Sequence, residues 1–268
     1  MRVDVGTSGY SYREWKGSFY PKGVGAKQML AYYATRFPAV ELNNTFYQMP
    51  DKAALAAQAS EVPEGFVFAV KAPGVITHQK RLKGCAVPVT ELWATVATLG
   101  ARLGPVLYGL PPNMKKDLPR LVEVLAMTPP GRRVAVELRH ESWLDEETYA
   151  ALRAAGAALC IADAEELTVP FVKTAPWGYL RLRRARYTGP ALAAWAEKIR
   201  GAGWTDACVY FKHEDEARGP VFAAKLRALL DGTPLPRAPR APAARARKPP
   251  AAPARSRKAP AVRKRSGR

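Results

Sequence analysis

The sequence predicts an α/β protein, a TIM-type (β/α)8 barrel followed by a disordered basic tail. Eight short β-rich runs alternate with longer segments of helical composition. Connections of that length join parallel strands, because a hairpin could not span them. Eight such units in roughly 230 residues favour a closed barrel. No glycine fingerprint for a dinucleotide follows the first run, which weakens the open-sheet alternative.

Each expected strand is a short run rich in β-branched, aromatic or other apolar residues. In chain order, the strands are expected at 3–8, 39–46, 66–72, 104–110, 132–139, 158–163, 177–183 and 206–213. The helices are expected between them, at 27–37, 51–62, 89–103, 117–127, 145–155, 190–200 and 220–230. The sixth connection, 164–175, is too short for a full helix. We therefore expect one barrel domain at 1–232 and a tail rich in Lys, Arg, Ala and Pro at 233–268.

Polar and apolar residues alternate within several of these strands. In the fifth strand, Val134 and Val136 lie on one face, and Glu137 and Arg139 on the other. The same alternation recurs in other strands, whose polar residues are Glu41, Asn43, Lys71, Arg181 and Lys212. A charge facing the helices would be costly, so these side chains are expected to point into the barrel. Those near the carboxyl ends of the strands would line the mouth, where barrel enzymes place their chemistry.

The expected inner set holds more cations than carboxylates. Lys71, Arg139, Arg181 and Lys212 oppose Glu41 and Glu137, with Asp163 at the end of the sixth strand as a third carboxylate. Arg183 follows the seventh strand, close to the region where barrels often bind phosphate. This balance predicts an anionic ligand. The alternative is that the charges only pair with one another.

Acid–base candidates are Glu137, Glu41, Asp163, His78 and His140. Burial raises a carboxyl pKa and neighbouring cations lower it, so the acid and the base are not assigned. His78 lies in the polar connection 73–88, a candidate lid. Lys71 could form a Schiff base if desolvated, although a charge partner is the simpler role. The histidines lack zinc spacing, so no cofactor is indicated, and a divalent ion on the three carboxylates stays open.

Several sequence segments occur together in a recognisable order. They are GTSGYSY at 6–12, FYP at 19–21, ELNNTFY at 41–47, Thr77-His78, VELRHESW at 136–143 and YLRL at 179–182. The first two segments and 41–47 are rich in aromatic residues that follow strand ends, and these rings serve either as core or as a surface that stacks on a sugar or base.

These segments resemble the YecE-like family, domain of unknown function 72, over about residues 3 to 232. The resemblance implies a TIM-type barrel and supplies no reaction. It implies pocket positions at Asn43, Asn44, Thr45, His78, Glu137, Arg139, His140, Trp143 and Arg181. The sequence departs from the family pattern at Tyr10, Arg183 and Lys212-His213, and the last two changes make the mouth more basic.

The basic charge of the chain is concentrated at its end. Lys and Arg number 42 against 23 Asp and Glu, a formal net charge of +19. Residues 237–268 contain 12 Lys and Arg, 10 Ala, 6 Pro and no acid, a composition that predicts an extended segment able to bind DNA or RNA without sequence preference. The alternative is a solubilising tail. The cysteines have no paired spacing, so no disulfide framework is expected. The sequence shows no apolar leader and no apolar run of spanning length, which predicts a cytoplasmic protein without membrane contact.

The leading functional hypothesis is an enzyme, of hydrolase or isomerase type, that acts on a phosphate-bearing substrate. The substrate would be a sugar phosphate or a nucleic acid, and the tail would hold the enzyme near polyanions. The alternative is a non-catalytic barrel that binds a sugar or nucleotide and is tethered to nucleic acid by its tail.

Overall fold

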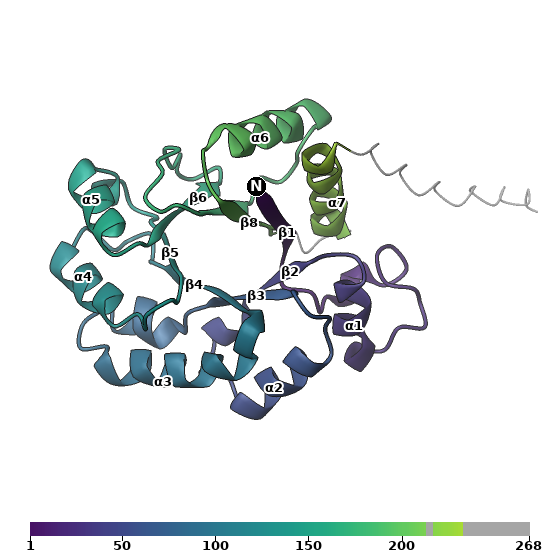
Figure 1. Cartoon of the computed structure of the whole chain (residues 1–268), viewed down its shortest axis with the longest axis horizontal. Coiled ribbons are helices and arrows are strands. Elements are labelled where there is room, and N and C mark those ends of the chain that lie inside the picture. The colour runs from purple at the N-terminus through teal and green to yellow at the C-terminus, as the bar shows by residue number, and fades with distance from the viewer. Residues whose placement is uncertain (213–216, 233–268) are drawn as a thin grey trace, which may run out of the picture. The chain divides into compact units, whose positions relative to one another are not determined.

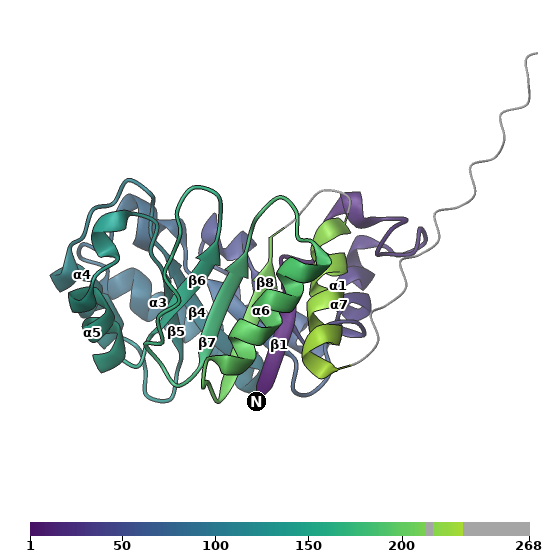
Figure 2. The same ribbon diagram turned by 90° about the horizontal axis from the view of Figure 1, so that it is seen from above.

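Eight parallel strands close into a barrel in chain order, and the first strand pairs with both the second and the eighth. The computed structural model describes residues 1–212 and 217–232. Figure 1 looks down the barrel, and Figure 2 shows the strands from the side with their carboxyl ends together. The strands are β1 Arg2–Ser8, β2 Ala39–Leu42, β3 Val67–Lys71, β4 Leu103–Gly109, β5 Val134–Glu137, β6 Ala158–Asp163, β7 Gly178–Leu182 and β8 Asp206–Phe211. The predicted barrel is confirmed. The predicted tail, 233–268, and His213 lie outside the described residues.

The helices surround the barrel (Figure 1). They are α1 Met29–Ala34, α2 Lys52–Ser60, α3 Ala86–Val96, α4 Leu118–Ala126, α5 Glu146–Ala154, α6 Gly189–Gly201 and α7 Arg218–Asp231. Side chains at the helix starts accept hydrogen bonds from backbone N–H groups, as Asp51 does from Ala54 and Asp145 from Thr148. The connection from β6 to β7 contains no helix, as its length predicts. Among the residues described, no helix is both long and apolar enough to cross a membrane.

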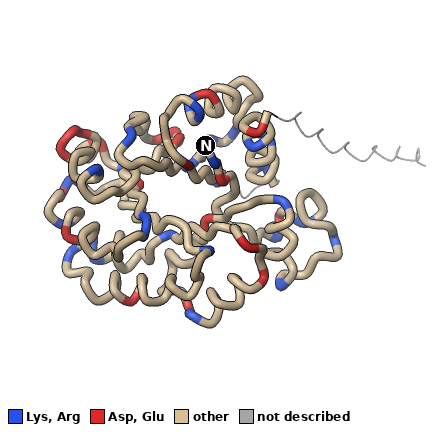
Figure 3. Tube along the Cα trace, in the orientation of Figure 1, with Lys and Arg blue, Asp and Glu red and all other residues tan. Residues whose placement is uncertain are grey.

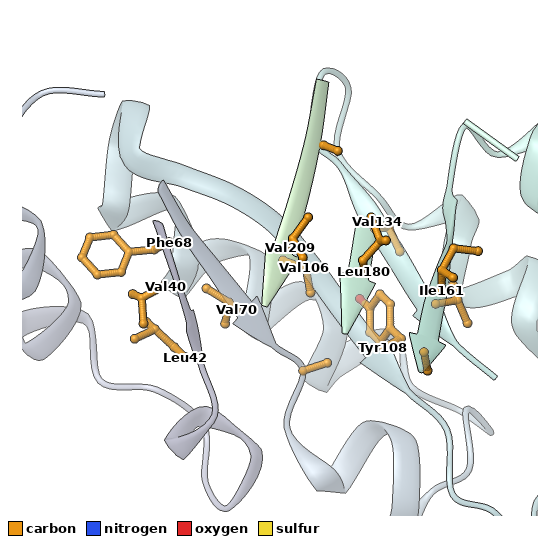
Figure 4. Packing of buried hydrophobic residues seen from close by; sticks show 14 of the residues in the cluster. Val40, Leu42, Phe68, Val70, Val106, Tyr108, Val134, Ile161, Leu180 and Val209 are labelled. Carbon is orange, nitrogen blue, oxygen red and sulfur yellow. The ribbon is translucent and has the colours of Figure 1, made fainter. Parts of the chain in front are cut away.

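Two cores result from the alternation along the strands. Large apolar side chains such as Val40, Phe68 and Val136 are buried between the strands and the helices, and Figure 4 shows part of this outer core. Inside the barrel, small buried side chains alternate with large rings. The small ones are Ala39, Ala69, Ala135, Cys160 and Cys208, and the rings are Tyr179 and Tyr210. The barrel interior is therefore packed by side chains below the mouth.

Strands β2 and β5 both end earlier than the sequence predicts. Strand β2 ends at Leu42, and a 3₁₀ turn, Asn44–Phe46, replaces the predicted extension to 46. The hydroxyl of Thr45 donates to the carbonyls of Leu42 and Lys71, at 3.0 and 2.6 Å, and these bonds hold the turn in place. Strand β5 ends at Glu137, after which His140 begins a second 3₁₀ turn. Both turns place polar side chains at the mouth.

Candidate functional site

Four ionisable side chains converge at the carboxyl ends of four strands. Glu41 comes from β2, Lys71 from β3, Glu137 from β5 and Arg181 from β7. Glu41, Glu137 and Arg181 are at most 3 % exposed, whereas Lys71 is half-buried. Lys, Arg, Asp and Glu positions occur around the central opening as well as on the helices (Figure 3). The predicted convergence of these side chains is present in the structure.

Arg181 is the centre of a buried network of ion pairs. Its Nη1 lies 2.6 Å from Glu137 Oε2, and its Nη2 lies 3.0 Å from Glu41 Oε1. Arg183 reaches the other Glu137 oxygen at 3.2 Å. The Tyr179 hydroxyl donates to Glu41 Oε2 at 2.6 Å. Each oxygen of the two carboxylates thus accepts at least one hydrogen bond.

Ser8 connects this network to the first strand. Its hydroxyl donates to Glu41 and accepts hydrogen bonds from Asn43 Nδ2 at 2.8 Å and Arg181 Nη2 at 3.2 Å. Ser8 and Tyr179 were not among the predicted site residues. Both residues lie on the inward-facing side of their strands, as Arg181 and the other mouth residues do. Ser8 is the last residue of β1, and Tyr179 lies two residues before Arg181 in β7, so the same alternation would have found them.

The network keeps Glu137 ionised. Burial alone would raise the pKa of Glu137, but the positive charges of Arg181, Arg183 and Arg139 prevail and lower it to about 2. A carboxylate with this pKa is not a general acid at neutral pH and is a weak base. The role of Glu137 that the geometry supports is to hold Arg181 and Arg183 in place.

Lys71 is in a different situation. Its Nζ lies 4.0 Å from the centre of the Phe46 ring, and no carboxylate of the described residues lies within 4.0 Å of it. Burial lowers the pKa of Lys71 to about 8, and the charge of Arg181 acts in the same direction. At neutral pH an appreciable fraction of this amine is therefore uncharged.

Gly109, at the end of β4, provides space between Lys71 and Glu137. A Cβ atom at this position would lie 3.2 Å from Glu137 Oε2 and 3.6 Å from Lys71 Cε. Both side chains therefore extend over a strand end that has no side chain of its own. This glycine was not predicted as part of the site, because its role appears only when β3, β4 and β5 are placed side by side.

Arg139 follows β5 and lines a cavity of about 280 Å³. The cavity is also lined by Pro112, Glu137, His140, Glu166 and Arg183. Arg139 makes no hydrogen bond and no ion pair with any residue in 1–212 or 217–232. Its guanidinium group keeps its donors available for a ligand.

A second cavity, of about 350 Å³, lies beside Lys71. It is lined by Tyr10, Asn43, Asn44, Phe46, Tyr47, Lys71 and Lys212, among others. Tyr47 is 86 % exposed, whereas Trp15 and Tyr20 are buried. The aromatic residues near the strand ends therefore divide between the two predicted roles, with Trp15 and Tyr20 in the core and Tyr47 available for stacking.

His78 lies on a π-helical turn, Val75–Gln79, that follows β3. Its Nδ1 is 2.9 Å from the Thr77 hydroxyl, and its ring packs edge-on against Phe46. Burial lowers the pKa of His78, and the charges of Lys71 and Arg139 lower it further. His78 is therefore neutral at pH 7. π-Turns are frequent at functional sites, and this one belongs to the predicted lid connection.

Three predicted site residues have structural contacts instead. Trp143 is fully buried, and its indole N–H donates to the Met114 carbonyl at 2.8 Å. The Thr45 hydroxyl is used by the turn after β2, and Thr45 is 3 % exposed. His140 Nδ1 accepts from the backbone N–H of Ser142 and starts a turn, although His140 still lines the cavity of Arg139. Trp143 and Thr45 are not available to a ligand.

Asp163 does not join the other carboxylates. Ala158, Cys160 and Ala162 face the barrel interior or the mouth, so Asp163 falls on the opposite, helix-facing side of β6. Its carboxylate accepts from Trp195 Nε1 at 3.1 Å and from the Tyr187 hydroxyl at 2.9 Å. The prediction of Asp163 as a mouth carboxylate was wrong, because the alternation within β6 was not followed to its last residue.

A metal on the three predicted carboxylates is not supported by their placement. Glu41 and Glu137 are ion-paired with Arg181, and Asp163 lies elsewhere. In the described part of the chain, no group of three His, Cys, Asp or Glu residues is placed to hold a metal ion.

The model of a protein family of unknown function, DUF72, matches residues 4–246. The chain belongs to the DUF72 family. This confirms the YecE-like resemblance of the sequence segments.

Two bacterial relatives illustrate the range of similarity. The UPF0759 protein YecE of Escherichia coli strain K12 is 32 % identical over 109 residues, which is 40 % of this chain and 40 % of YecE. This match therefore spans less than half of the length of YecE. The UPF0759 protein YunF of Bacillus subtilis is 24 % identical over 229 residues, covering 80 % of this chain and 79 % of YunF.

Crystal structures of DUF72 proteins share the barrel. One from Thermotoga maritima superposes with a TM-score of 0.73 at 26 % identity and covers 86 % of this chain and 100 % of that protein. One from Enterococcus faecalis gives a TM-score of 0.72 at 18 % identity, covering 85 % and 95 % respectively. The second likeness shows the fold alone.

Proposed function

We propose that this DUF72 protein is an enzyme that binds a phosphate-bearing substrate at the barrel mouth and transfers a proton there. The observation that carries the proposal is the state of two cations. Arg139 and Lys71 line mouth cavities, and neither forms an ion pair with a carboxylate of the described residues. Glu41 and Glu137 are paired with Arg181 and Arg183, and the other two carboxylates at the Arg139 cavity, Glu141 and Glu166, form no ion pair with it. An anionic ligand would supply the missing partner.

The roles follow from the contacts. Arg139 offers its guanidinium group to a phosphate, and Arg183 lines the same cavity while it holds Glu137. Lys71, with its lowered pKa, is the proton acceptor at neutral pH. His78 is neutral and close to Phe46, so it serves as a second proton carrier. Glu41 and Glu137 act as positioning residues for Arg181.

Cavity size narrows the substrate class to a small molecule or the end of a larger one. The two cavities measure about 280 and 350 Å³. Drug-sized ligands occupy pockets of roughly 300 to 1,000 Å³, so one sugar phosphate or one nucleotide unit fits this range. The exposed ring of Tyr47 beside Lys71 gives such a ligand a stacking surface.

Calorimetric titration with inorganic phosphate, at fixed ionic strength, tests the binding step. Arg139→Gln should weaken phosphate binding by tenfold or more, because an ionic hydrogen-bond partner is worth about 1.5–3 kcal/mol. Arg132→Gln is the matched control, since Arg132 is an exposed arginine that precedes β5 at the other end of the barrel. Equal losses in the two variants, or no phosphate binding by the parent protein, would contradict the proposal.

Turnover separates an enzyme from a binding protein. A library of sugar phosphates and nucleotides should contain a compound that the parent protein converts and that Lys71→Met does not. The non-catalytic alternative is supported by the ion pairs and hydrogen bonds of Glu41 and Glu137, because these contacts already engage both carboxylates. If compounds in the library raise the melting temperature of the protein but none is converted to product, the result would favour the non-catalytic barrel and contradict the proposed catalysis.

We also propose that the basic tail binds nucleic acid without sequence preference. Its 12 Lys and Arg within residues 237–268 carry this proposal. If about half of them meet phosphates, the logarithm of the DNA association constant should fall with log salt at a slope of about −5. A chain ending at Pro236 should lose both the affinity and the slope. Equal affinity and slope in the two chains would make the tail a solubilising segment only.

A further inference from the structure

We propose that Lys71 is a nucleophile that forms an imine with the carbonyl carbon of a small phosphorylated aldehyde or ketone. This inference rests on the proposed function, because the same mouth cations would hold the phosphate. It goes further by giving the substrate a reactive group and Lys71 a covalent role.

The position of Lys71 meets the first requirement of such a lysine, which is access. Lys71 is the last residue of β3, and its side chain lines the cavity of about 350 Å³ at the mouth. Phe46 forms an apolar surface under the amine, with Nζ 4.0 Å from the ring centre. Gly109 lets the Lys71 stem pass over the end of β4, since a Cβ atom at this position would lie 3.6 Å from Lys71 Cε. A planar carbonyl compound that enters this cavity therefore meets the amine directly.

The charges around Lys71 meet the second requirement, which is an available electron pair. The ionisable groups that act on it come from several elements: Glu41 on β2, Glu137 on β5, Arg181 on β7, Lys212 after β8 and His78 on the turn after β3. Glu41 and Glu137 are each engaged by Arg181, so their attraction for the ammonium form is offset. Burial and the positive neighbours lower the pKa of Lys71 to about 8, in the range in which lysines act as nucleophiles.

The anion-holding groups meet the third requirement, which is orientation. Arg139 and Arg183 line the cavity of about 280 Å³ together with Glu137, and Glu137 Oε2 and Lys71 Cε both lie beside Gly109. A phosphate held by these arginines would direct the other end of a short molecule toward Lys71. Positioning of this kind converts a slow bimolecular addition into an effectively unimolecular one.

The chemistry is balanced without an oxidant or reductant. The lone pair of the neutral amine forms a bond to the carbonyl carbon, and the carbonyl π electrons move to oxygen, which takes a proton. The resulting carbinolamine loses its oxygen as water when the C–O bond breaks, and the C=N bond forms. Counted from the ammonium form, lysine and the carbonyl compound give a protonated imine and one water. His78, neutral and near the same ring, can carry the proton between nitrogen and oxygen.

Reductive trapping tests this inference on the full chain. The probe is pyridoxal 5′-phosphate, an aldehyde that carries a phosphate, and borohydride then converts an imine to a stable secondary amine. Peptide mass spectrometry locates the modified lysines. Lys71 should be modified at least ten times faster than Lys52, an exposed lysine at the start of α2 in the same molecule. Because both sites are read in one sample, the comparison does not depend on a variant that folds.

Three variants, one analogue and competition by inorganic phosphate assign the contributions. Lys71→Met should remove the fast site, and Arg139→Gln should slow modification of Lys71 by about tenfold while Arg132→Gln leaves it unchanged. Pyridoxal, which lacks the phosphate, should modify Lys71 at least ten times more slowly than pyridoxal 5′-phosphate does. Inorganic phosphate should protect Lys71 in proportion to its occupancy.

The outcomes separate this inference from the proposed function. If phosphate binds in an Arg139-dependent way but Lys71 is trapped no faster than Lys52, the imine is contradicted and the phosphate site stands. If pyridoxal and its phosphate modify Lys71 equally and inorganic phosphate does not protect it, the phosphorylated substrate class is contradicted, and the proposed function fails with it.

Discussion

Glu137 and Lys71 flank Gly109 at the barrel mouth, and both have a lowered pKa for different reasons. The guanidinium groups of Arg181 and Arg183 overcome the burial of Glu137 and keep it charged. Burial acts on Lys71 without an ion-pair partner and favours its neutral form. The two side chains therefore make opposite contributions to stability at neutral pH.

Replacing Glu137 by Gln should destabilise the protein by about 3–5 kcal/mol at pH 7, because Arg181 would be left buried without one of its partners. The pKa of Glu137 is about 2 in the folded protein and ordinarily 4.5, so its stabilisation is complete above pH 4.5 and is lost as pH falls toward 2. Urea unfolding at pH 7 and pH 3.5 measures this. A variant with the same deficit at both pH values would contradict the assignment.

Replacing Lys71 by Met should stabilise the protein at pH 7 by about 1–2 kcal/mol, once the lost contact with Phe46 is subtracted. Between pH 8 and 10.5 the unfolded chain holds the Lys71 proton and the folded one does not, so the parent gains stability over this window. The advantage of the variant should therefore disappear above pH 10. Lys52→Met, at an exposed position, should show no such pH dependence, and a Lys71→Met variant without it would refute the lowered pKa.

At the scale of an element, the turn after β2 fixes Asn43, Asn44 and Phe46 at the mouth. Thr45 holds this turn through two carbonyl contacts, one within the turn and one to β3. The turn therefore connects the strand that carries Glu41 with the strand that carries Lys71.

Thr45→Val removes the hydroxyl with little change in shape. It should cost about 1–3 kcal/mol of unfolding free energy, because two buried carbonyls lose a donor. Thr35→Val provides the control, since its hydroxyl bonds a carbonyl at an exposed position and its loss should change stability by less than about 0.5 kcal/mol. Equal effects in chemical denaturation would show that the turn is not held by Thr45.

The strands were predictable because their alternation is strict. Val134 and Val136 face the helices while Glu137 faces inward, as the period of two requires. The end of a strand is less well defined in the sequence. Residues 43–46 end in the strand-forming residues Thr45 and Phe46, yet a side-chain hydrogen bond from Thr45 turns the chain, and such a contact depends on β3, which is distant in sequence.

The candidate site was predictable as a set of inward charges and not as a set of pairs. The alternation places Glu41, Lys71, Glu137 and Arg181 together, but it does not show that Arg181 takes both carboxylates and leaves Lys71 without one. These ion pairs depend on how far the Arg181 side chain extends across the barrel toward β2 and β5. Asp163 also lies at a strand end, but it is one residue out of step with the inward-facing positions of β6, so its carboxylate points to the helices.

At the scale of the whole molecule, cationic side chains occur both at the barrel mouth and in residues 237–268. The mouth has a small number of cations fixed by strands, whereas the tail sequence repeats Lys and Arg without acidic residues. The first arrangement selects a ligand by geometry, and the second attracts polyanions in general. We expect the two to act independently, so removal of residues 237–268 should leave phosphate affinity at the mouth unchanged in calorimetry.

The central claim is that the mouth at the carboxyl ends of the strands binds phosphate. A crystal structure of the protein with ribose 5-phosphate tests it most directly. We predict phosphate density within hydrogen-bonding distance of the Arg139 guanidinium group, in the cavity that Arg183 also lines. Density instead in the cavity at the opposite end of the barrel, beside Arg2, Arg132 and Arg133, or an empty mouth at saturating ligand, would contradict it.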